Sequence, residues 1–186
     1  MRIISGERKG KKILQPKDKL TRPLKDLAKE SIFNIIQHSK KFSVKLEKSL
    51  ILDLFSGVGS FGIECLSRKA AFVIFIENYE EVLSILKKNI NNLNYSNFSS
   101  VIETDIFNQL IFKNLNSQFD IIFIDPPFKE KNLNKLLNEI NISEILNKNG
   151  IIIIHRHKKE EDDLPNQFKI IEKKIYGISK IIFGRF

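Results

Sequence analysis

Four consecutive residues, Asp125-Pro126-Pro127-Phe128, carry the most specific chemical signal in the sequence. They directly follow an apolar run at 121–124, so they should form the loop at the end of a strand. Two prolines fix the backbone and remove two amide donors, so the loop offers oxygens, the Asp125 carboxylate and the Pro126 carbonyl. Two acceptors on an exocyclic purine amine would free its nitrogen lone pair, and Phe128 supplies a ring for stacking the flipped base. The motif predicts chemistry on such an amine, although an isolated copy would indicate an ordinary loop.

A glycine-rich stretch upstream ends another apolar run and reads Asp53-Leu54-Phe55-Ser56-Gly57-Val58-Gly59-Ser60-Phe61-Gly62. Its glycines permit a tight turn and let backbone amides approach a ligand closely. Glu77 ends the next apolar run, where a carboxylate can accept hydrogen bonds from both hydroxyls of a ribose. These features predict a nucleotide site built by Phe55, Gly57, Gly59 and Glu77. They do not name the nucleotide, because dinucleotide folds also place an acid about 20 residues after such glycines.

Two further acids favour S-adenosylmethionine over a dinucleotide. Asp53 lies inside the strand before the glycines, where it could hold the ammonium group of a methionine moiety. Asp105 follows the third predicted strand and could accept a hydrogen bond from the adenine amine. Each acid alone would more often cap a helix at a strand-to-helix turn. Their order at consecutive strand ends favours the cofactor.

The positive charge is concentrated in the first quarter of the chain. Residues 1–48 contain 14 Lys or Arg and 5 Asp or Glu, whereas the rest contain 17 of each. This asymmetry is typical of a surface that meets a polyanion, although a solvated basic face would look the same. The residues expected to contact RNA are Arg8, Lys9, Lys11, Lys12 and Arg22.

The elements that must position these residues alternate between strands and helices. Apolar runs predict strands at 50–55, 72–76, 101–103, 121–124 and 151–154, separated by helices at 60–68, 79–93, 106–112 and 132–146. Such alternation predicts an α/β fold with a Rossmann-like, mostly parallel sheet. The last two strands, 168–176 and 179–183, are joined by two residues and must be antiparallel. Before the sheet, two short strands and an amphipathic helix from Leu24 to His38 form a small basic appendage.

Other features of the chain predict no additional chemistry. Cys65 is the only cysteine, and no signal peptide or membrane-spanning run is present, which indicates a reducing cytoplasm. His155 and His157 flank Arg156 without a third ligand at suitable spacing, so no metal site is predicted. The charged stretch 158–163 should be an exposed loop.

These motifs resemble the bacterial 16S rRNA guanine-N2 methyltransferases that modify guanine 966, the small-subunit rRNA methyltransferase D family. The similarity spans almost the whole chain. It is carried by Arg2-Ile3-Ile4-Ser5-Gly6, Arg8-Lys9-Gly10-Lys11-Lys12, Arg22-Pro23, Glu30-Ser31-Ile32-Phe33-Asn34, the stretch from Asp53 to Gly59, Leu66-Ser67-Arg68-Lys69-Ala70-Ala71 and Asp125-Pro126-Pro127-Phe128.

The resemblance implies a seven-stranded methyltransferase fold, S-adenosylmethionine as methyl donor, and 16S rRNA or a small-subunit assembly particle as substrate. The chain departs from the family pattern at four residues. Leu24 replaces a threonine, Phe128 replaces the usual tyrosine, and His155-Arg156 stands where an acid is usual. We expect a monomeric single domain with a basic RNA-binding extension (1–48) and a catalytic core (49–186).

Three alternatives stay open on the sequence. Asp-Pro-Pro-aromatic chemistry also serves adenine-N6 methyltransferases on RNA or DNA. A dinucleotide-dependent oxidoreductase shares the glycine loop but not Asp53 or the terminal antiparallel pair. A non-catalytic RNA-binding protein would not need an intact Asp125 loop.

Overall fold

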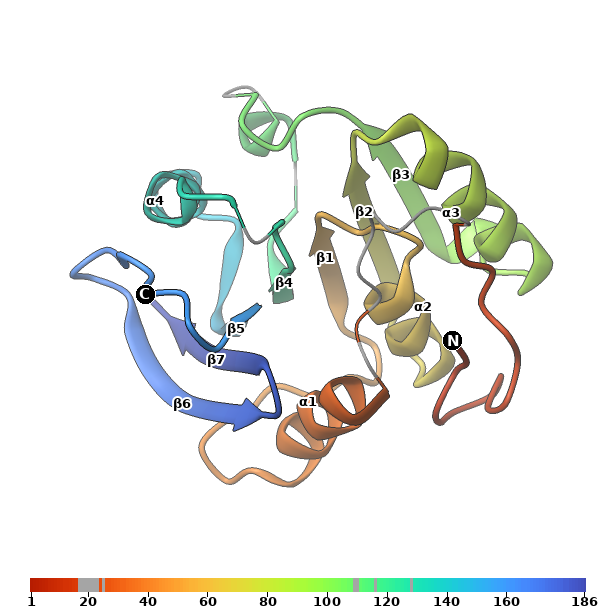
Figure 1. The fold of residues 1–186 in the computed structure, drawn as a ribbon, viewed down its shortest axis with the longest axis horizontal. Helices are drawn as coiled ribbons and strands as arrows, with labels where there is room; N and C mark the ends of the chain where they lie inside the picture. Colours follow the sequence, from red (N-terminus) through yellow and green to blue (C-terminus); the bar gives the residue numbers. More distant parts are fainter. Residues whose placement is uncertain (17–23, 25, 109–110, 116, 128) are drawn as a thin grey trace.

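The sheet that organises the described part of the chain has seven strands in the order β3-β2-β1-β4-β5-β7-β6 (Figure 1). The computed structural model describes residues 1–16, 24, 26–108, 111–115, 117–127 and 129–186. Within this sheet, β7 alone runs opposite to the other strands. The predicted α/β fold, with a mostly parallel sheet and an antiparallel C-terminal pair, is therefore confirmed. The strands are β1 (Leu50–Leu54), β2 (Phe72–Glu77), β3 (Ser99–Glu103), β4 (Phe119–Ile124), β5 (Leu146–His157), β6 (Lys169–Tyr176) and β7 (Ser179–Arg185).

Helices pack on both faces of this sheet. Successive residues of a strand point to opposite faces, so Ile153 packs in the core beneath three helices and Ile154 packs in the core beneath the fourth. Burial on both faces explains why the central strands are continuous apolar runs. No helix among the described residues is long and apolar enough to cross a membrane. The first face carries α1 (Asp26–His38), α2 (Ser60–Ser67) and α3 (Glu80–Asn92), and the second carries α4 (Leu133–Ile142).

Two of the predicted helices are wrong in part. The segment expected to be a helix at 106–112 begins with a turn, because the Asp105 side chain accepts a hydrogen bond from the Phe107 amide at 2.9 Å. Among the described residues of this segment, a short 3-10 helix, Phe112–Asn114, follows. The helix predicted to extend to 146 ends at Ile142, and Glu144 then adopts a positive φ of 48° that a helix cannot contain.

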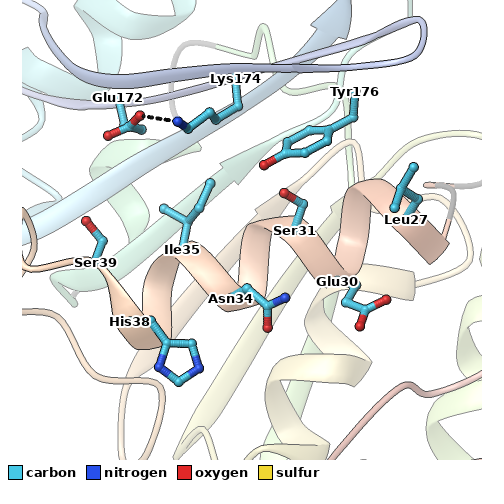
Figure 2. Close-up of a pocket in the computed structure, with 10 residues that line it drawn as sticks. All are labelled: Leu27, Glu30, Ser31, Asn34, Ile35, His38, Ser39, Glu172, Lys174 and Tyr176. Atoms are coloured by element: carbon cyan, nitrogen blue, oxygen red, sulfur yellow. Dashed lines mark ion pairs between the residues drawn. The ribbon is translucent and has the colours of Figure 1, made fainter.

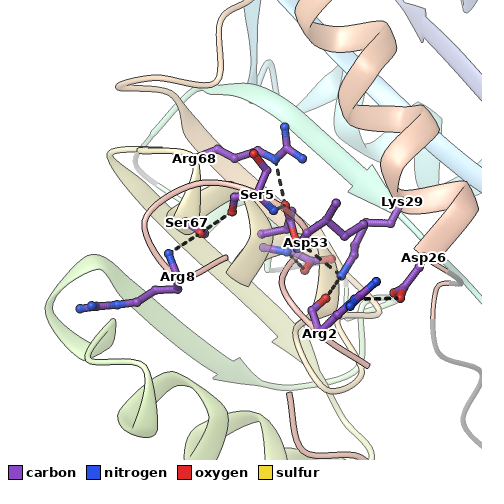
Figure 3. A network of polar contacts seen from close by, with 11 residues as sticks. Arg2, Ser5, Arg8, Asp26, Lys29, Asp53, Ser67 and Arg68 are labelled. Carbon is purple, nitrogen blue, oxygen red and sulfur yellow. Dashed lines mark hydrogen bonds and ion pairs between the residues drawn. The ribbon is translucent and has the colours of Figure 1, made fainter. Parts of the chain in front are cut away.

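The basic N-terminal segment is a hairpin held by buried polar groups. Its two arms meet at one bridge, Arg2 with Lys12, rather than as two full strands. Glu64 of α2 is fully buried and accepts hydrogen bonds from the amides of Ile4 and Ser5 at 2.7 and 2.9 Å. Figure 3 shows Ser67 linking Ser5 and Arg8 in the same network. The hairpin is therefore fixed on the helix that follows the glycine loop.

A buried ion pair ties α1 to this arrangement. The Nζ atom of Lys29 lies 3.6 Å from the Glu64 carboxylate and donates a hydrogen bond of 2.7 Å to the Arg2 carbonyl (Figure 3). Burial lowers the pKa of Lys29, and the negative charge of Glu64 opposes this change. Removing Glu64 would leave the buried Lys29 without this partner, which costs about 3–5 kcal/mol, whereas Glu64 without Lys29 would still pair with Arg68 at 2.9 Å. Hairpin, α1 and α2 thus form one packed unit.

Candidate active site

The candidate site lies where β1 and β4 are neighbours at the carboxyl edge of the sheet. From β1 the chain continues to β2 and β3 on one side, then returns to place β4 on the other. Open α/β sheets bind their ligands at such switch points. Asp53 on β1 and Asp125 after β4 both come to this edge, and the Asp125 amide donates to the Leu54 carbonyl at 3.4 Å. The structure therefore brings together acids that lie 72 positions apart in the sequence.

The glycine loop leaves β1 through an unusual backbone conformation. Phe55 has a positive φ of 58°, which is rare for a residue with a bulky side chain. Gly57 and Gly59 follow with φ values of 54° and 83°. A Cβ at Gly59 would lie 2.5 Å from Leu86, whereas a Cβ at Gly57 would meet no heavy atom within 4 Å. The space beside Gly57 is therefore open to a ligand.

Asp53 is a buried carboxylate next to the first turn of α2. One of its oxygens accepts a hydrogen bond of 3.0 Å from the Gly62 amide. Burial raises the pKa of Asp53 well above its ordinary value, the Gly62 hydrogen bond acts in the opposite direction, and the charges of Asp125 and Glu77 raise it further. A cation binding beside Asp53 would stabilise the ionised form. This environment fits the predicted role of holding an ammonium group.

Glu77 is already held by three backbone amides. It accepts hydrogen bonds from Gly57 at 2.7 Å and from Asn78 and Tyr79 at 2.9 Å each. A carboxylate offers about four lone-pair positions, so this arrangement leaves room for one more donor. Glu77 therefore fits one ribose hydroxyl, fewer than the two that the sequence suggested, and it also fixes the glycine loop.

Asp105 lies at the edge of the site and is exposed. One carboxylate oxygen accepts the Phe107 amide, as in the turn-capping alternative considered for the sequence. The Phe107 ring lies 6.3 Å from the ring of Phe55, measured between centroids. This contact places the turn after β3 beside the glycine loop. Phe128 and Arg22, also predicted as site residues, lie outside the described residues.

Nothing in the sequence pattern assigned a role to His155, yet His155 contacts the predicted catalytic acid. Its Nδ1 atom lies 2.8 Å from Oδ1 of Asp125, and its Nε2 atom lies 2.9 Å from Oγ of Ser179. His155 is separated from Asp125 by 30 residues and from Ser179 by 24. No local pattern reveals these contacts, since each residue comes from a different strand end.

Arg156, the next residue on β5, points to the other face and holds the loop that follows Asp125. It donates hydrogen bonds to the carbonyls of Pro127 at 3.2 Å and Glu130 at 2.9 Å. Its Nε atom donates to Asp162 at 2.6 Å, and Nζ of Lys180 lies 2.7 Å from the other oxygen of Asp162. The expectation that 158–163 is an exposed loop is wrong for Asp162, whose side chain is 3% exposed. Asp162 is paired with two buried cations, Arg156 and Lys180, and these pairs compensate the burial of its charge.

A separate groove of about 790 Å³ runs between α1 and β6 (Figure 2). Glu30, Ser31 and Asn34 of the Glu-Ser-Ile-Phe-Asn segment line it, whereas Ile32 and Phe33 are buried in the core. The segment thus divides its polar and apolar residues between two surfaces of α1. The lining residues are Leu27, Glu30, Ser31, Asn34, Ile35, His38, Ser39, Glu172, Lys174 and Tyr176.

The surroundings of Cys65 and of the possible metal ligands do not favour chemistry. Cys65 is buried on α2, and burial raises the pKa of its thiol, so the reactive thiolate is disfavoured. Within the described ranges, no three His, Cys, Asp or Glu side chains gather where they could hold a metal ion.

Comparison with known proteins identifies relatives along the whole chain. A family model described as Conserved hypothetical protein 95 matches residues 1–185. The Ribosomal RNA small subunit methyltransferase D of Buchnera aphidicola (subsp. Acyrthosiphon pisum) is 35% identical over 173 residues, covering 93% of this chain and 86% of that protein. The protein of the same name from Haemophilus influenzae is 30% identical and covers 96% and 90%.

A solved structure, "Putative methyltransferase yhhF from Escherichia coli", superimposes with a TM-score of 0.82 at 24% identity and covers 99% of this chain and 96% of that one. At this level of identity the likeness supports the fold.

Proposed function

The chain belongs to the small-subunit rRNA methyltransferase D family, and from this premise we propose that it methylates the exocyclic N2 of guanine 966 in 16S rRNA. Two of its relatives, 35% and 30% identical, are named as methyltransferases of small-subunit ribosomal RNA. The assignment to the N2 atom and to guanine 966 rests on the sequence signatures and on the acceptor oxygens of Asp125 and Pro126.

The observation that carries the proposal is the meeting of Asp125 and Asp53 at the switch point of the sheet. When bound, S-adenosylmethionine supplies a methyl group that is already activated by its sulfonium. Asp53, Glu77 and the open space beside Gly57 would hold this donor, and the buried Asp53 carboxylate fits its ammonium group. The protein then needs to orient the base rather than to create a strong nucleophile.

The Asp125 carboxylate and the Pro126 carbonyl provide the acceptors for the amine. Hydrogen bonds from the amine to these oxygens would direct its lone pair toward the methyl group that the bound donor would supply. The amine then loses one proton, which Asp125 or water accepts.

The N-terminal hairpin is the proposed contact for RNA phosphates. Lys9, Lys11 and Lys12 are exposed on it, and the Arg8 amide is fixed by Ser67 at 3.0 Å. Because Glu64 anchors this hairpin to α2, a phosphate contact there would set the position of the RNA relative to the glycine loop.

The deciding experiment incubates the protein with labelled S-adenosylmethionine and unmethylated 30S particles and maps the product by mass spectrometry. We expect a single methyl group on N2 of guanine 966. Label on an adenine would replace the guanine assignment with an adenine-N6 activity. Label on another guanine would refute the assignment to guanine 966. Asp125→Ala should abolish transfer while cofactor affinity, measured by calorimetry, changes by only a few fold.

A further inference from the structure

We propose that His155 is a positioning residue for Asp125, fixing one carboxylate oxygen so that the other faces the amine of the substrate base. This inference rests on the proposed function, in which Asp125 accepts a hydrogen bond from that amine. It assigns a role to a position where the chain departs from the acid that is usual in its family.

Both ring nitrogens of His155 are engaged. Nδ1 lies 2.8 Å from Oδ1 of Asp125, and Nε2 lies 2.9 Å from Oγ of Ser179. An ionised carboxylate only accepts hydrogen bonds, so Nδ1 must carry the hydrogen. In the neutral ring, Nε2 then accepts from the Ser179 hydroxyl. With the ring neutral, the hydrogen bonds run in one direction, from Ser179 through His155 to Asp125.

The antiparallel pairing of β5 with β7 brings His155 and Ser179 together. His155 pairs with Ile181 across β5 and β7, and His157 pairs with Ser179. Residues two apart on a strand share a face, so the side chains of His155 and Ser179 are diagonal neighbours. Ser179 at the start of β7 is therefore connected to Asp125 through His155.

Fixing the carboxylate matters because the terminal torsion of aspartate is broad. Asp125 has a side chain that is 23% exposed, whereas that of His155 is 13% exposed. The hydrogen bond from the more enclosed His155 to Oδ1 restricts this torsion, so Oδ2 remains to receive the amine. Misplacement of a reacting group by about 1 Å can reduce a rate about a hundredfold.

The same three residue types also form nucleophilic triads, with serine as the attacking group. In this protein the aspartate, not the serine, lies beside the glycine loop, and Ser179 is 7% exposed. The arrangement therefore fits a carboxylate held in position better than an activated serine.

The test compares two substitutions at His155. Asparagine can place a donor near the position of Nδ1, whereas leucine removes the donor and keeps an apolar side chain. With 30S particles as substrate, we expect His155→Leu to lower kcat about tenfold to a hundredfold. The KM for particles and the affinity for S-adenosylmethionine should stay within about twofold, because the contacts of both ligands remain. His155→Asn should recover kcat to within about threefold of the wild type.

His157→Asn on the same strand is the matched control and should retain wild-type kcat. The inference is overturned if His155→Leu keeps kcat within twofold, or if asparagine and leucine impair kcat equally. If His155→Leu fails to fold, Ser179→Ala tests the inference instead. A lowered kcat with unchanged KM supports the hydrogen bonds from Ser179 through His155 to Asp125, and an unchanged kcat refutes their role. Asp125→Ala is measured in parallel. If that variant still turns over, the proposed function fails; if it is inactive while His155→Leu is active, only the role of His155 is lost.

Discussion

The guanidinium of Arg156 donates a hydrogen bond of 3.2 Å to the carbonyl oxygen of Pro127. A second donor of the same group reaches the Glu130 carbonyl at 2.9 Å. These two hydrogen bonds hold the loop after Asp125 at Pro127 and at Glu130. The Arg156 side chain lies on the opposite face of β5 from His155. Because the Arg156 side chain is 3% exposed and paired with Asp162, it has little freedom to move. The loop is therefore held by one rigid cation.

Arg156→Lys should lower kcat for particle methylation about tenfold or more while cofactor affinity stays within a few fold. Lysine keeps the charge but cannot reproduce the planar fork that reaches two carbonyls and Asp162 together. Steady-state kinetics and calorimetry measure the two quantities. Lys158→Arg, two residues away and exposed, is the control. An equal loss of kcat in both variants would exclude a specific hold on the loop.

Asp53→Asn should raise the free energy of unfolding of the cofactor-free protein at neutral pH and weaken cofactor binding. Burial raises the folded-state pKa of Asp53 above 3.8, so the folded protein keeps a proton that the unfolded chain releases. The wild type therefore loses stability as the pH rises from 3.8, until the pH exceeds the folded-state pKa. Asparagine does not titrate, so the difference between the two proteins should be independent of pH below pH 3.8 and grow above it. Denaturant unfolding across this range measures the effect, with the exposed Asp105→Asn as control, and a constant difference would contradict it.

Gly57→Ala should fold but bind S-adenosylmethionine at least about tenfold more weakly. Its positive φ costs an alanine about 1 kcal/mol, and the added methyl group enters the open space beside the glycine loop. Gly10→Ala has the same backbone cost, since Gly10 has a φ of 84° and an open environment in the hairpin. Calorimetric titration should separate the two variants. Similar affinities would place the cofactor away from Gly57.

Neutralising Arg8, Lys9, Lys11 and Lys12 together should weaken RNA binding and flatten its dependence on salt. For every phosphate that the variant no longer neutralises, the slope of log affinity against log salt concentration should fall by about 0.7–0.9. A control replaces four exposed lysines outside the hairpin, Lys113, Lys135, Lys148 and Lys158. Binding of an rRNA fragment at several salt concentrations gives both slopes. An unchanged slope in the hairpin variant would assign the RNA to another surface.

Much of the fold followed from local patterns in the sequence. All seven strands and their parallel or antiparallel sense were predicted, because strands buried on both faces are continuous apolar runs and a two-residue connection leaves no room for a crossover. The errors came where a side chain changed the backbone locally. Asp105 caps a turn in place of the expected helix, and Glu144 ends α4 early. Neither event alters hydrophobic periodicity, so periodicity could not reveal it.

The sequence by itself determined the order of strands and helices, the glycine loop, the acid at each strand end and the basic N-terminal segment, because each depends on residues close together in the chain. Only the tertiary structure decided which groups hold the site. His155 meets Asp125 across 30 residues, and Glu64 meets the hairpin across about 60. The contacts of Arg156 with Pro127 and Glu130 likewise join separate segments. Such contacts depend on which strands become neighbours in the sheet and on the register of their pairing, and neither leaves a periodic trace in the residues themselves.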